Sequence, residues 1–441
     1  NKQNFLFPYL IPSTAIIFES YFDTLKRFPI ACEFFLRKEK NQISSQEHKD
    51  FYNQVGHAFD DPWLTLHYRT EGMVEYTALM YIPTEKPFDL FDPERKSHIK
   101  LYIKRVFITD NCSEVLPPYL RFLRGIIDAQ DLPLNISREM LQHDLRLQKI
   151  KTNCTKKILS ELSEKKKKDP VGYQGFWKNF GPVLKEGLYE EESKQENILA
   201  LCLFHHAQND DFISLETYKE KMLPEQKSIY YLMGESLDFV QYHPQLEAFK
   251  KQNIDVLLLV DPIDHFWISK VSEFQKIPLK SILQDREILD TLGKKEDSQE
   301  DKDSDAGIQD LNKMLAEMKI VYGDEIKEVR LNKHLQDNAV SIIDESPIPK
   351  HMMRHFGGNS ASFPSSKVLE INPKHSLIKL LSNFYENKDK EGNSFNDLSK
   401  LLLDQALIID GQSIRNPKEF SEIFTRFLTK DGRVSKIIIP N

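Results

Sequence analysis

The chain has 441 residues, of which 40% are hydrophobic and 29% are charged, and its formal net charge is -7. This length and composition are typical of a soluble globular protein with two or three domains. The modest acidic charge argues against a nucleic-acid partner, and no apolar run approaches the roughly 18 residues of a membrane span. Residues 1–10 also lack the basic start and long apolar core of a secretion signal.

The cysteine and histidine pattern indicates neither a disulfide framework nor a metal site. No CxxC pair occurs, because the cysteines lie far apart in the sequence. The adjacent histidines at 205–206 have no cysteine or acidic neighbour at metal-ligand spacing. A reducing cytoplasm is therefore the expected location. The four cysteines are Cys32, Cys112, Cys154 and Cys202.

The first part of the chain is predicted to be mixed α/β. Residues 1–35 are rich in Phe, Ile and Leu without a clear period, so we treat them as an atypical N-terminal segment. Apolar residues then recur at i, i+4 and i+8 over 46–59 and predict a helix. Residues 74–83 and 99–108 are rich in β-branched and aromatic side chains, which predicts two strands.

The stretch 117–142 reads PPYLRFLRGIIDAQDLPLNISREMLQ and is predicted to form two helices around a polar loop. Leu120, Leu123 and Ile127 recur at i, i+3 and i+7, which predicts the first helix. The proline in the loop disfavours helix at the residue before it, so a second helix is expected to start near Ile136.

Arg138 falls in the first turn of this second helix, where the amide dipoles disfavour a cation. Such an arginine needs an anionic partner, and helix N-termini themselves bind phosphates and carboxylates. Arg138, the adjacent amides and Gln142, one turn later on the same face, are therefore a candidate anion site. A salt bridge from Arg138 to Asp131 or Glu139 is the alternative.

Residues 227–283 carry a strand, helix, strand pattern. KSIYYLM predicts a strand, a helix in two pieces follows around Pro244, and the apolar run IDVLLLV fits a buried parallel strand. This pattern predicts a doubly wound sheet and raises the alternative of an α/β nucleotide-binding enzyme. No GxGxxG or GxxxxGK[ST] motif occurs in the chain, so that alternative lacks a phosphate-binding loop.

A highly charged segment at 285–306 is predicted to be a linker between domains. It has no apolar residue between Leu292 and Ala306, and such a segment cannot bury enough surface to order itself. Beyond it, an apolar stripe from Ile308 predicts a helix, and IKEVRLN and VLEIN predict strands.

Two amphipathic helices near the C-terminus are candidates for a dimer interface. In the last one, Asn416, Pro417 and Glu419 provide an N-cap, a first-turn proline and a capping-box acid. Its apolar face is too wide to be left uncovered. Packing inside the domain and a symmetric dimer both satisfy this pattern. The residues are Phe395, Leu398 and Leu402 in the earlier helix, and Phe420, Ile423, Phe424, Phe427 and Leu428 in the last one.

Two short apolar stretches are candidates for binding unfolded polypeptide. Phe266 and Trp267 follow a predicted buried strand, and Met352, Met353 and Phe356 lie in PKHMMRHF before two glycines. Methionine is flexible and polarizable, which suits an adaptable binding surface. Packing in an ordinary core is the alternative for both stretches.

LYIKRVFITDNC at 101–112, followed by RGIIDAQDLPLNISREMLQ at 124–142, resembles the signature of the middle domain of the heat shock protein 90 chaperones in their bacterial HtpG form. The resemblance covers roughly 36–430 and continues through FWKNFGPVLKEG, IYYLMGESL, VLLLVDPID and LLLDQALI.

This resemblance implies a multidomain α/β and α+β fold. The implied middle domain spans 36–284, with two α/β subdomains joined by helices, and an α+β dimerisation domain follows the linker. In detail, the large subdomain spans 36–150, the helical connector 151–195, the small subdomain 196–284, the linker 285–306 and the dimerisation domain 307–441.

The resemblance also implies residue roles. In that family the Arg of SREMLQ contacts the terminal phosphate of ATP held by a preceding N-terminal domain, and the Gln one turn later assists, which implies these roles for Arg138 and Gln142. Phe107 in RVFIT matches a position that supports the contact with that domain. The two apolar stretches match client-binding regions, and the two C-terminal helices match a four-helix dimer interface.

The function implied by the resemblance is that of a molecular chaperone, which holds unfolded client proteins in an ATP-driven homodimeric clamp. ATP and Mg are the cofactors of the family, but its ATP-pocket motifs match no position here. We therefore expect the chain to lack the N-terminal ATPase domain, to hold no cofactor itself and to hydrolyse no ATP alone. A passive dimeric scaffold is a further alternative.

Overall fold

The computed structural model divides the chain into two compact units, residues 1–202 and 203–441, which are described separately below. The division lies near the predicted start of the small subdomain. The predicted boundary at 285–306 does not divide the units, because 203–283 belongs to the same unit as the C-terminal region. The residues described are 35–36, 38, 42–56, 59–92, 95, 97–134, 141, 143–285, 288–289, 305–345, 366–387 and 393–430.

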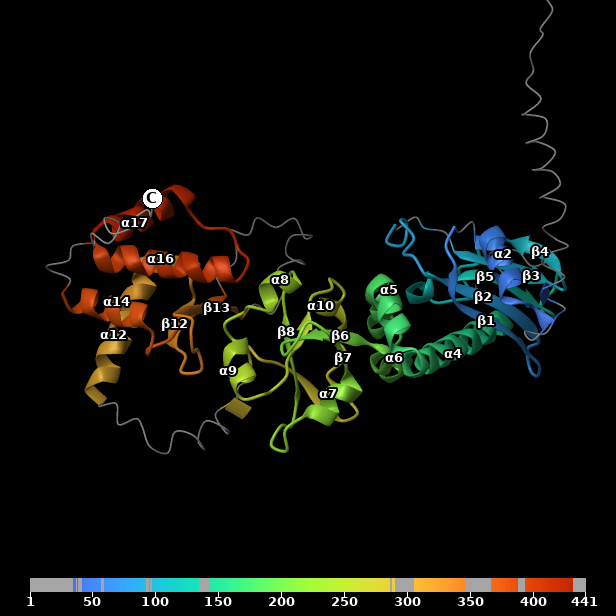
Figure 1. Cartoon of the computed structure of the whole chain (residues 1–441), viewed down its shortest axis with the longest axis horizontal. Coiled ribbons are helices and arrows are strands. Elements are labelled where there is room, and N and C mark those ends of the chain that lie inside the picture. Colours follow the sequence, from blue (N-terminus) through green and yellow to red (C-terminus); the bar gives the residue numbers. More distant parts are fainter. Residues whose placement is uncertain are drawn as a thin grey trace, which may run out of the picture. The chain divides into compact units, whose positions relative to one another are not determined.

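A five-stranded sheet with the strand order β1-β2-β5-β3-β4 organises the first unit (Figure 1). Strand β3 pairs parallel with β5, and the other pairs are antiparallel. Helix α2 (Ser45–Gly56) packs on this sheet through Phe51, Tyr52 and Val55. The predicted helix at 46–59 is therefore confirmed as far as Gly56, whereas Phe59 lies beyond the helix end and is fully exposed. The strands are β1 (Pro62–Thr70), β2 (Tyr76–Pro83), β3 (His98–Ile103), β4 (Val106–Thr109) and β5 (Arg124–Ala129).

The predicted helix around Leu120 to Ile127 is wrong. Only the 3-10 turn η2 (Pro118–Leu120) forms, and β5 begins after three intervening residues. Of the three residues in the predicted stripe, Leu120 ends the turn, Leu123 precedes the strand and Ile127 lies in β5. In that strand Ile126 and Ile127 are buried from both faces of the sheet. Gly125 lies at a φ of +150° against the backbone of β2, a close approach that only glycine permits.

Among the described residues of this unit, the helices that follow the sheet are α4 (Leu145–Lys168), α5 (Pro170–Glu190) and α6 (Gln195–Leu201), with the 3-10 turn η3 (Glu192–Lys194) before α6. Asp144 caps α4 by accepting from the backbone N–H groups of Arg146 and Leu147, and Asp169 caps α5 by accepting from Gly172. The indole of Trp63 on β1 stacks on Phe176 of α5 at 4.7 Å, which fixes α5 against the sheet.

A six-stranded sheet with the order β10-β11-β8-β9-β6-β7 begins the second unit. The predicted strand, helix, strand pattern is confirmed: β8 and β9 are parallel, and two short helices between them flank Pro244. The elements are β6 (Leu203–His206), β7 (Phe212–Ser214), α7 (Leu215–Lys221), β8 (Ile229–Met233), α8 (Leu237–Val240), α9 (Leu246–Lys251), β9 (Leu257–Leu259), α10 (Asp264–Trp267), β10 (Glu273–Phe274) and β11 (Ile277–Ser281).

The C-terminal region of this unit is a three-stranded sheet, β12-β14-β13, covered by helices. The sheet is mixed, because its central strand β14 pairs parallel with β12 and antiparallel with β13. The elements are α12 (Asp305–Tyr322), η4 (Gly323–Glu325), β12 (Glu328–Leu331), β13 (Val340–Asp344), β14 (Lys367–Ile371), α14 (Ser376–Glu386), α16 (Ser394–Ile409) and α17 (Pro417–Lys430).

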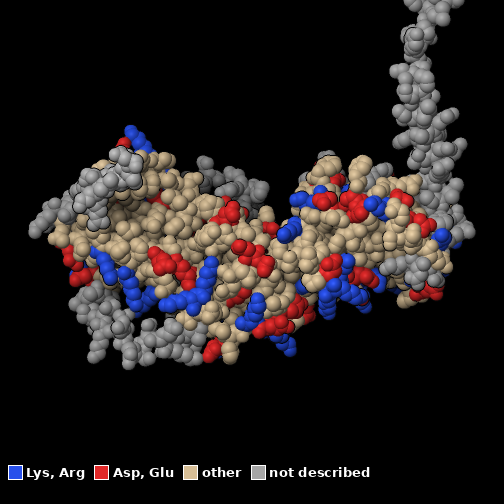
Figure 2. All heavy atoms as spheres, in the orientation of Figure 1, with Lys and Arg blue, Asp and Glu red and all other residues tan. Residues whose placement is uncertain are grey.

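The face of the molecule drawn in Figure 2 is mixed in charge. On the face drawn in Figure 2, basic and acidic side chains lie interspersed over both units. None of the helices within the described ranges combines the length and apolar character that a bilayer crossing requires.

Candidate functional site

The end of β5 and the β3–β4 hairpin form a single hydrogen-bonded corner. Lys104 and Arg105 form the hairpin turn with φ values of 49° and 68°, the left-handed pair that a two-residue turn requires. Lys104 N donates to Ala129 O at 3.1 Å, and Arg105 N donates to Asp128 Oδ1 at 2.9 Å. Burial raises the pKa of Asp128, whose other oxygen accepts from Gln130 Nε2 at 2.7 Å. The turn is therefore fixed to the end of β5.

Phe107 follows this turn on the edge strand β4 and is half exposed, with 52% of its surface accessible. Its ring packs edge-on against Tyr102 at 5.6 Å, so the neighbouring strand supports it from one side. Val106 beside it is exposed to the same degree. Because neighbouring residues on a strand point to opposite faces of the sheet, Phe107 and Val106 expose apolar surface on different faces of this edge.

Arg138 and Gln142 lie outside the described residues, but the chain on both sides of them is anchored. Asp131 Oδ2 accepts from the backbone N–H of Glu75 at 2.6 Å, and Asp131 O accepts from Arg146 Nη1 at 2.7 Å. Arg146 also donates to the cap residue Asp144 through Nη2 at 2.7 Å. The segment that carries Arg138 thus leaves and returns at one hydrogen-bonded base.

This base also involves the predicted alternative partner of Arg138, because the Asp131 carboxylate accepts a hydrogen bond from the backbone N–H of Glu75, the residue before β2. The two flanking leucines Leu132 and Leu141 are buried and hold the base against the core. The Arg146 guanidinium, which donates to Asp144, holds the pKa of Asp144 below its usual value.

Trp267 belongs to the core, so its prediction as a client-binding residue is wrong. Its side chain is fully buried, and its indole N–H donates to Asp264 Oδ1 at 2.7 Å. Asp264 in turn accepts from the backbone N–H of Asp261 at 3.0 Å and closes the turn before α10. Phe266 is partly exposed. The second predicted stretch, Met352, Met353 and Phe356, lies outside the described residues.

The C-terminal helices separate the predicted dimer residues into two groups. Phe395, Leu398 and Leu402 pack into the core against α12 and the sheet, so their prediction as interface residues is wrong. Ile423 is buried as well, and Phe427 packs against the same core through Phe384. Phe424 and Leu428 are each 49% exposed, and Phe420 stacks on Phe424 at 5.8 Å. We call Phe420, Phe424 and Leu428 the outer face of α17.

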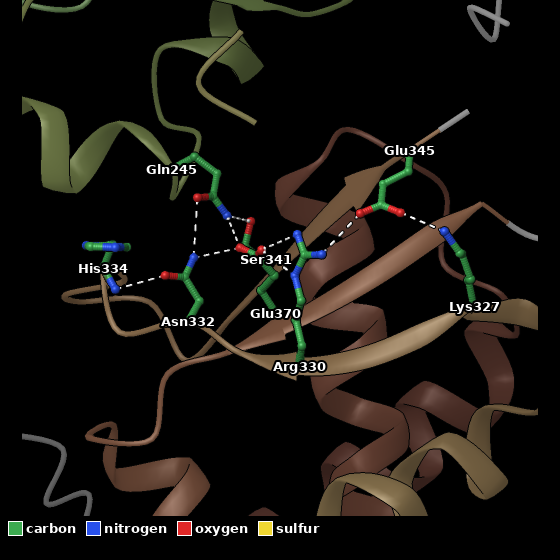
Figure 3. A network of polar contacts seen from close by, with 8 residues as sticks. All are labelled: Gln245, Lys327, Arg330, Asn332, His334, Ser341, Glu345 and Glu370. Atoms are coloured by element: carbon green, nitrogen blue, oxygen red, sulfur yellow. Dashed lines mark hydrogen bonds and ion pairs between the residues drawn. The ribbon is translucent and has the colours of Figure 1, made fainter. Parts of the chain in front are cut away.

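A buried polar network, which the sequence did not reveal, crosses the second unit (Figure 3). Its centre is the carboxylate of Glu370 on β14, which has no exposed surface. Gln245, from the turn before α9, donates to Glu370 Oε2 at 2.7 Å across 125 residues of sequence. The one sequence signal was a glutamate in the middle of the apolar strand VLEIN, because such a residue needs a buried partner.

The described cysteines are buried, and both histidines of the pair at 205–206 contact neighbouring side chains. Cys112, Cys154 and Cys202 are buried free thiols, and burial raises the pKa of Cys112 to about 12 and that of Cys154 to about 11. His206 Nδ1 lies 2.7 Å from Asp255 Oδ2, and His205 packs on Phe212. Within the described ranges, no three His, Cys, Asp or Glu side chains gather as metal ligands would.

The sequence of this chain matches a family model and several known proteins. The family model described as Hsp90 protein matches residues 34–437. A protein named Chaperone protein HtpG from Paramagnetospirillum magneticum is 41% identical over 398 residues, which are 89% of this chain and 63% of that protein. Those of Roseobacter denitrificans and Wolbachia pipientis wMel are 44% and 39% identical, covering 86% and 89% of this chain and 61% and 62% of theirs. The chain therefore spans under two thirds of these relatives, and it belongs to the Hsp90 protein family.

Proposed function

We propose that this chain contributes the nucleotide-sensing arginine, a client-binding surface and the dimer contact of an HtpG-type chaperone. The observation that carries the proposal is the anchored base of the Arg138 segment, which lies next in sequence to the corner that fixes the exposed Phe107. A segment held at both ends can present a cation reproducibly, and a rigid apolar edge beside it can dock a second domain.

In this proposal Arg138 donates to the terminal phosphate of ATP bound by a nucleotide-binding domain outside these 441 residues, and Gln142 assists. Mg would be held with ATP by that domain and would neutralise charge on the phosphates, and Arg138 would neutralise the charge that develops on the terminal phosphoryl group. Phe107 supports the contact with that domain. Asp131, Arg146 and Asp144 position Arg138 by holding the two ends of its segment together.

The remaining parts of the proposal concern clients and dimerisation. Phe266, with Met352, Met353 and Phe356, provides apolar contacts for unfolded polypeptide. The outer face of α17 pairs with the same face of a second copy. Phe420 and Phe424 stack on each other, and Phe424 and Leu428 are half exposed one helical turn apart, so together they offer a continuous apolar surface to a partner. The clamp then closes on a client when the two nucleotide-binding domains engage Arg138 on each side.

The test of the nucleotide role is Arg138→Ala in the protein with its nucleotide-binding domain. Arginine fingers contribute on the order of 1000-fold or more to phosphoryl transfer, so ATP turnover is expected to fall steeply. Lys156→Ala, which removes an exposed cation from α4, is the matched control and leaves turnover unchanged. Turnover that is equal in Arg138→Ala and in the unmodified protein removes Arg138 from this role.

The client role has its own test, the suppression of aggregation of a chemically unfolded protein. A chaperone of this class delays aggregation at stoichiometric amounts, and Phe266→Ser weakens the effect because it removes an apolar contact. A passive dimeric scaffold leaves the aggregation rate unchanged, and that result would replace the client role by the scaffold alternative.

A further inference from the structure

The two regions of the second unit keep separate hydrophobic cores. Buried residues such as Tyr230, Phe249 and Val256 form one cluster around the six-stranded sheet. Buried residues such as Met318 and Leu402 form another between the three-stranded sheet and its helices. Hydrogen bonds join residues 203–283 to the C-terminal region around the turn before α9, and this contact is polar.

One side of this contact is a row of side chains that crosses the three-stranded sheet. Glu370 pairs in register with Arg330 on β12 and with Ser341 on β13. Arg330 donates to Glu370 Oε1 through Nε at 3.0 Å and through Nη2 at 2.8 Å. Asn332 Nδ2 donates to Glu370 Oε2 at 2.6 Å. The carboxylate is thus held by an arginine and an amide on its own sheet.

Gln245 covers this row from the other region (Figure 3). Its Nε2 donates to Glu370 Oε2 at 2.7 Å and to Ser341 Oγ at 3.1 Å, and its Oε1 accepts from Asn332 Nδ2 at 3.4 Å. The Gln245 amide therefore acts both as a hydrogen-bond donor and as an acceptor. We call Gln245, Arg330, Asn332, Ser341 and Glu370 the polar joint.

A second carboxylate makes the reciprocal contact. Glu247 on α9 accepts through Oε2 from the backbone N–H groups of Gln336 at 2.8 Å and of Asp337 at 3.0 Å, and Asn338 Nδ2 donates to its Oε1. Two carboxylates, one from each region, thus bind donors on the opposite side. Hydrogen bonds weaken steeply when their angles change, so these contacts favour one angle between the regions.

We propose that the polar joint and Glu247 act as a latch that sets the angle between residues 203–283 and the C-terminal region. When the contact opens, each region keeps its own core, and the carboxylates and amides exchange their partners for water. Inter-domain contacts of this polar kind are typical of parts that move relative to one another. The latch is independent of the proposed chaperone function, because it involves neither nucleotide nor client.

The test is the distance between two spin labels, one in each region of the full 441-residue chain. Glu220→Cys on α7 and Lys379→Cys on α14 are exposed attachment positions, and Cys32→Ser leaves only the buried native thiols. An excess of unlabelled chain suppresses distances between copies. The intact latch is expected to give one narrow distance distribution.

Gln245→Ala and Glu370→Gln are expected to lose this narrow distribution and to give a broad one. Glu345→Gln is the matched control, since Glu345 accepts from Arg330 Nη1 at 3.1 Å but does not contact Gln245, and it keeps the narrow distribution. If Glu370→Gln does not fold, Gln245→Ala decides alone, because Glu370 then retains Arg330 and Asn332.

Two outcomes overturn the proposal: a distribution that is already broad in the unmodified chain, or one that stays narrow in Gln245→Ala. Neither outcome bears on ATP turnover or on aggregation suppression, so a failure of the latch is distinguishable from a failure of the proposed function.

Discussion

The side-chain amide of Gln245 donates to the carboxylate of Glu370, 125 residues further along the chain, at 2.7 Å. Both side chains are excluded from solvent. Because a buried carboxylate is costly unless its oxygens are occupied, this pair couples two regions that have separate hydrophobic cores.

A double-mutant cycle with Gln245→Leu and Glu370→Gln measures that coupling. Contacting residues in one network typically show interaction energies of about 0.5–3 kcal/mol, and we expect a value in this range from urea unfolding. Glu345→Gln, on the exposed end of the same network, is expected to change the free energy of unfolding by less than about 0.5 kcal/mol. Additive effects of the two substitutions would show that the observed hydrogen bond stabilises nothing.

Gly125→Ala is expected to prevent the first unit from folding. A Cβ at this position would overlap the carbonyl oxygen of Leu79, and the φ of +150° is unfavourable for any side chain. Gly175→Ala is the control, since no atom lies near its Cβ position on α5, and alanine there stabilises the helix by about 0.5–1 kcal/mol. Circular dichroism of both variants separates these outcomes, and a natively folded Gly125→Ala would contradict the observed packing of β5 on β2.

Removing the cap of α4 is expected to have a pH-dependent effect. Asp144→Ala should cost about 1 kcal/mol at neutral pH, because the carboxylate accepts from two backbone N–H groups. The pKa of Asp144 is lowered in the folded state, so its charged form contributes stability above the unfolded pKa of about 3.9, and this contribution disappears as the pH falls through the lower folded value.

Urea unfolding across that pH range measures the effect as the difference between the original chain and Asp144→Ala. Asp144→Asn is the control, because asparagine caps a helix about as well and does not titrate. A difference that stays constant down to strongly acidic pH would show that the capping bond does not depend on charge.

Phe424→Glu is expected to weaken the proposed dimer. Phe424 lies on the outer face of α17, and burying a charge in an apolar contact should cost at least 2 kcal/mol, which is on the order of 30-fold in the dissociation constant. Thr429→Glu places the same charge on the opposite, exposed side of the helix and should have little effect. Light scattering over a dilution series measures both, and an original chain that is monomeric throughout would contradict the interface itself.

Elements with a local side-chain pattern could be predicted from the amino-acid sequence. The amphipathic helices α2, α16 and α17 and the β8, α8, α9, β9 pattern follow from side-chain periods that a helix or a buried strand imposes. The motifs around Phe107 and Arg138 identified the family before any fold was known, because a long ungapped resemblance is independent of geometry.

The tertiary structure decided what periodicity cannot distinguish. A strand buried on both faces and a short helix can have the same pattern of apolar residues, and 124–129 is a strand because it pairs with β2 on one side and with β3 on the other. Trp267 and Phe266 are neighbours in the sequence, yet Trp267 is buried and donates to Asp264, whereas Phe266 is partly exposed. The pattern of apolar residues in α16 and α17 likewise does not distinguish the residues that pack in the core from those that stay exposed.

The polar joint shows most clearly that a local sequence pattern cannot identify contacts between distant residues. The glutamate in VLEIN indicates that Glu370 needs a buried partner, but nothing in the local sequence identifies that partner as Gln245, which lies 125 residues earlier in the chain. Local propensity depends on a few neighbouring residues, whereas burial and hydrogen bonding depend on which distant surfaces meet, so only the folded chain brings such a pair together.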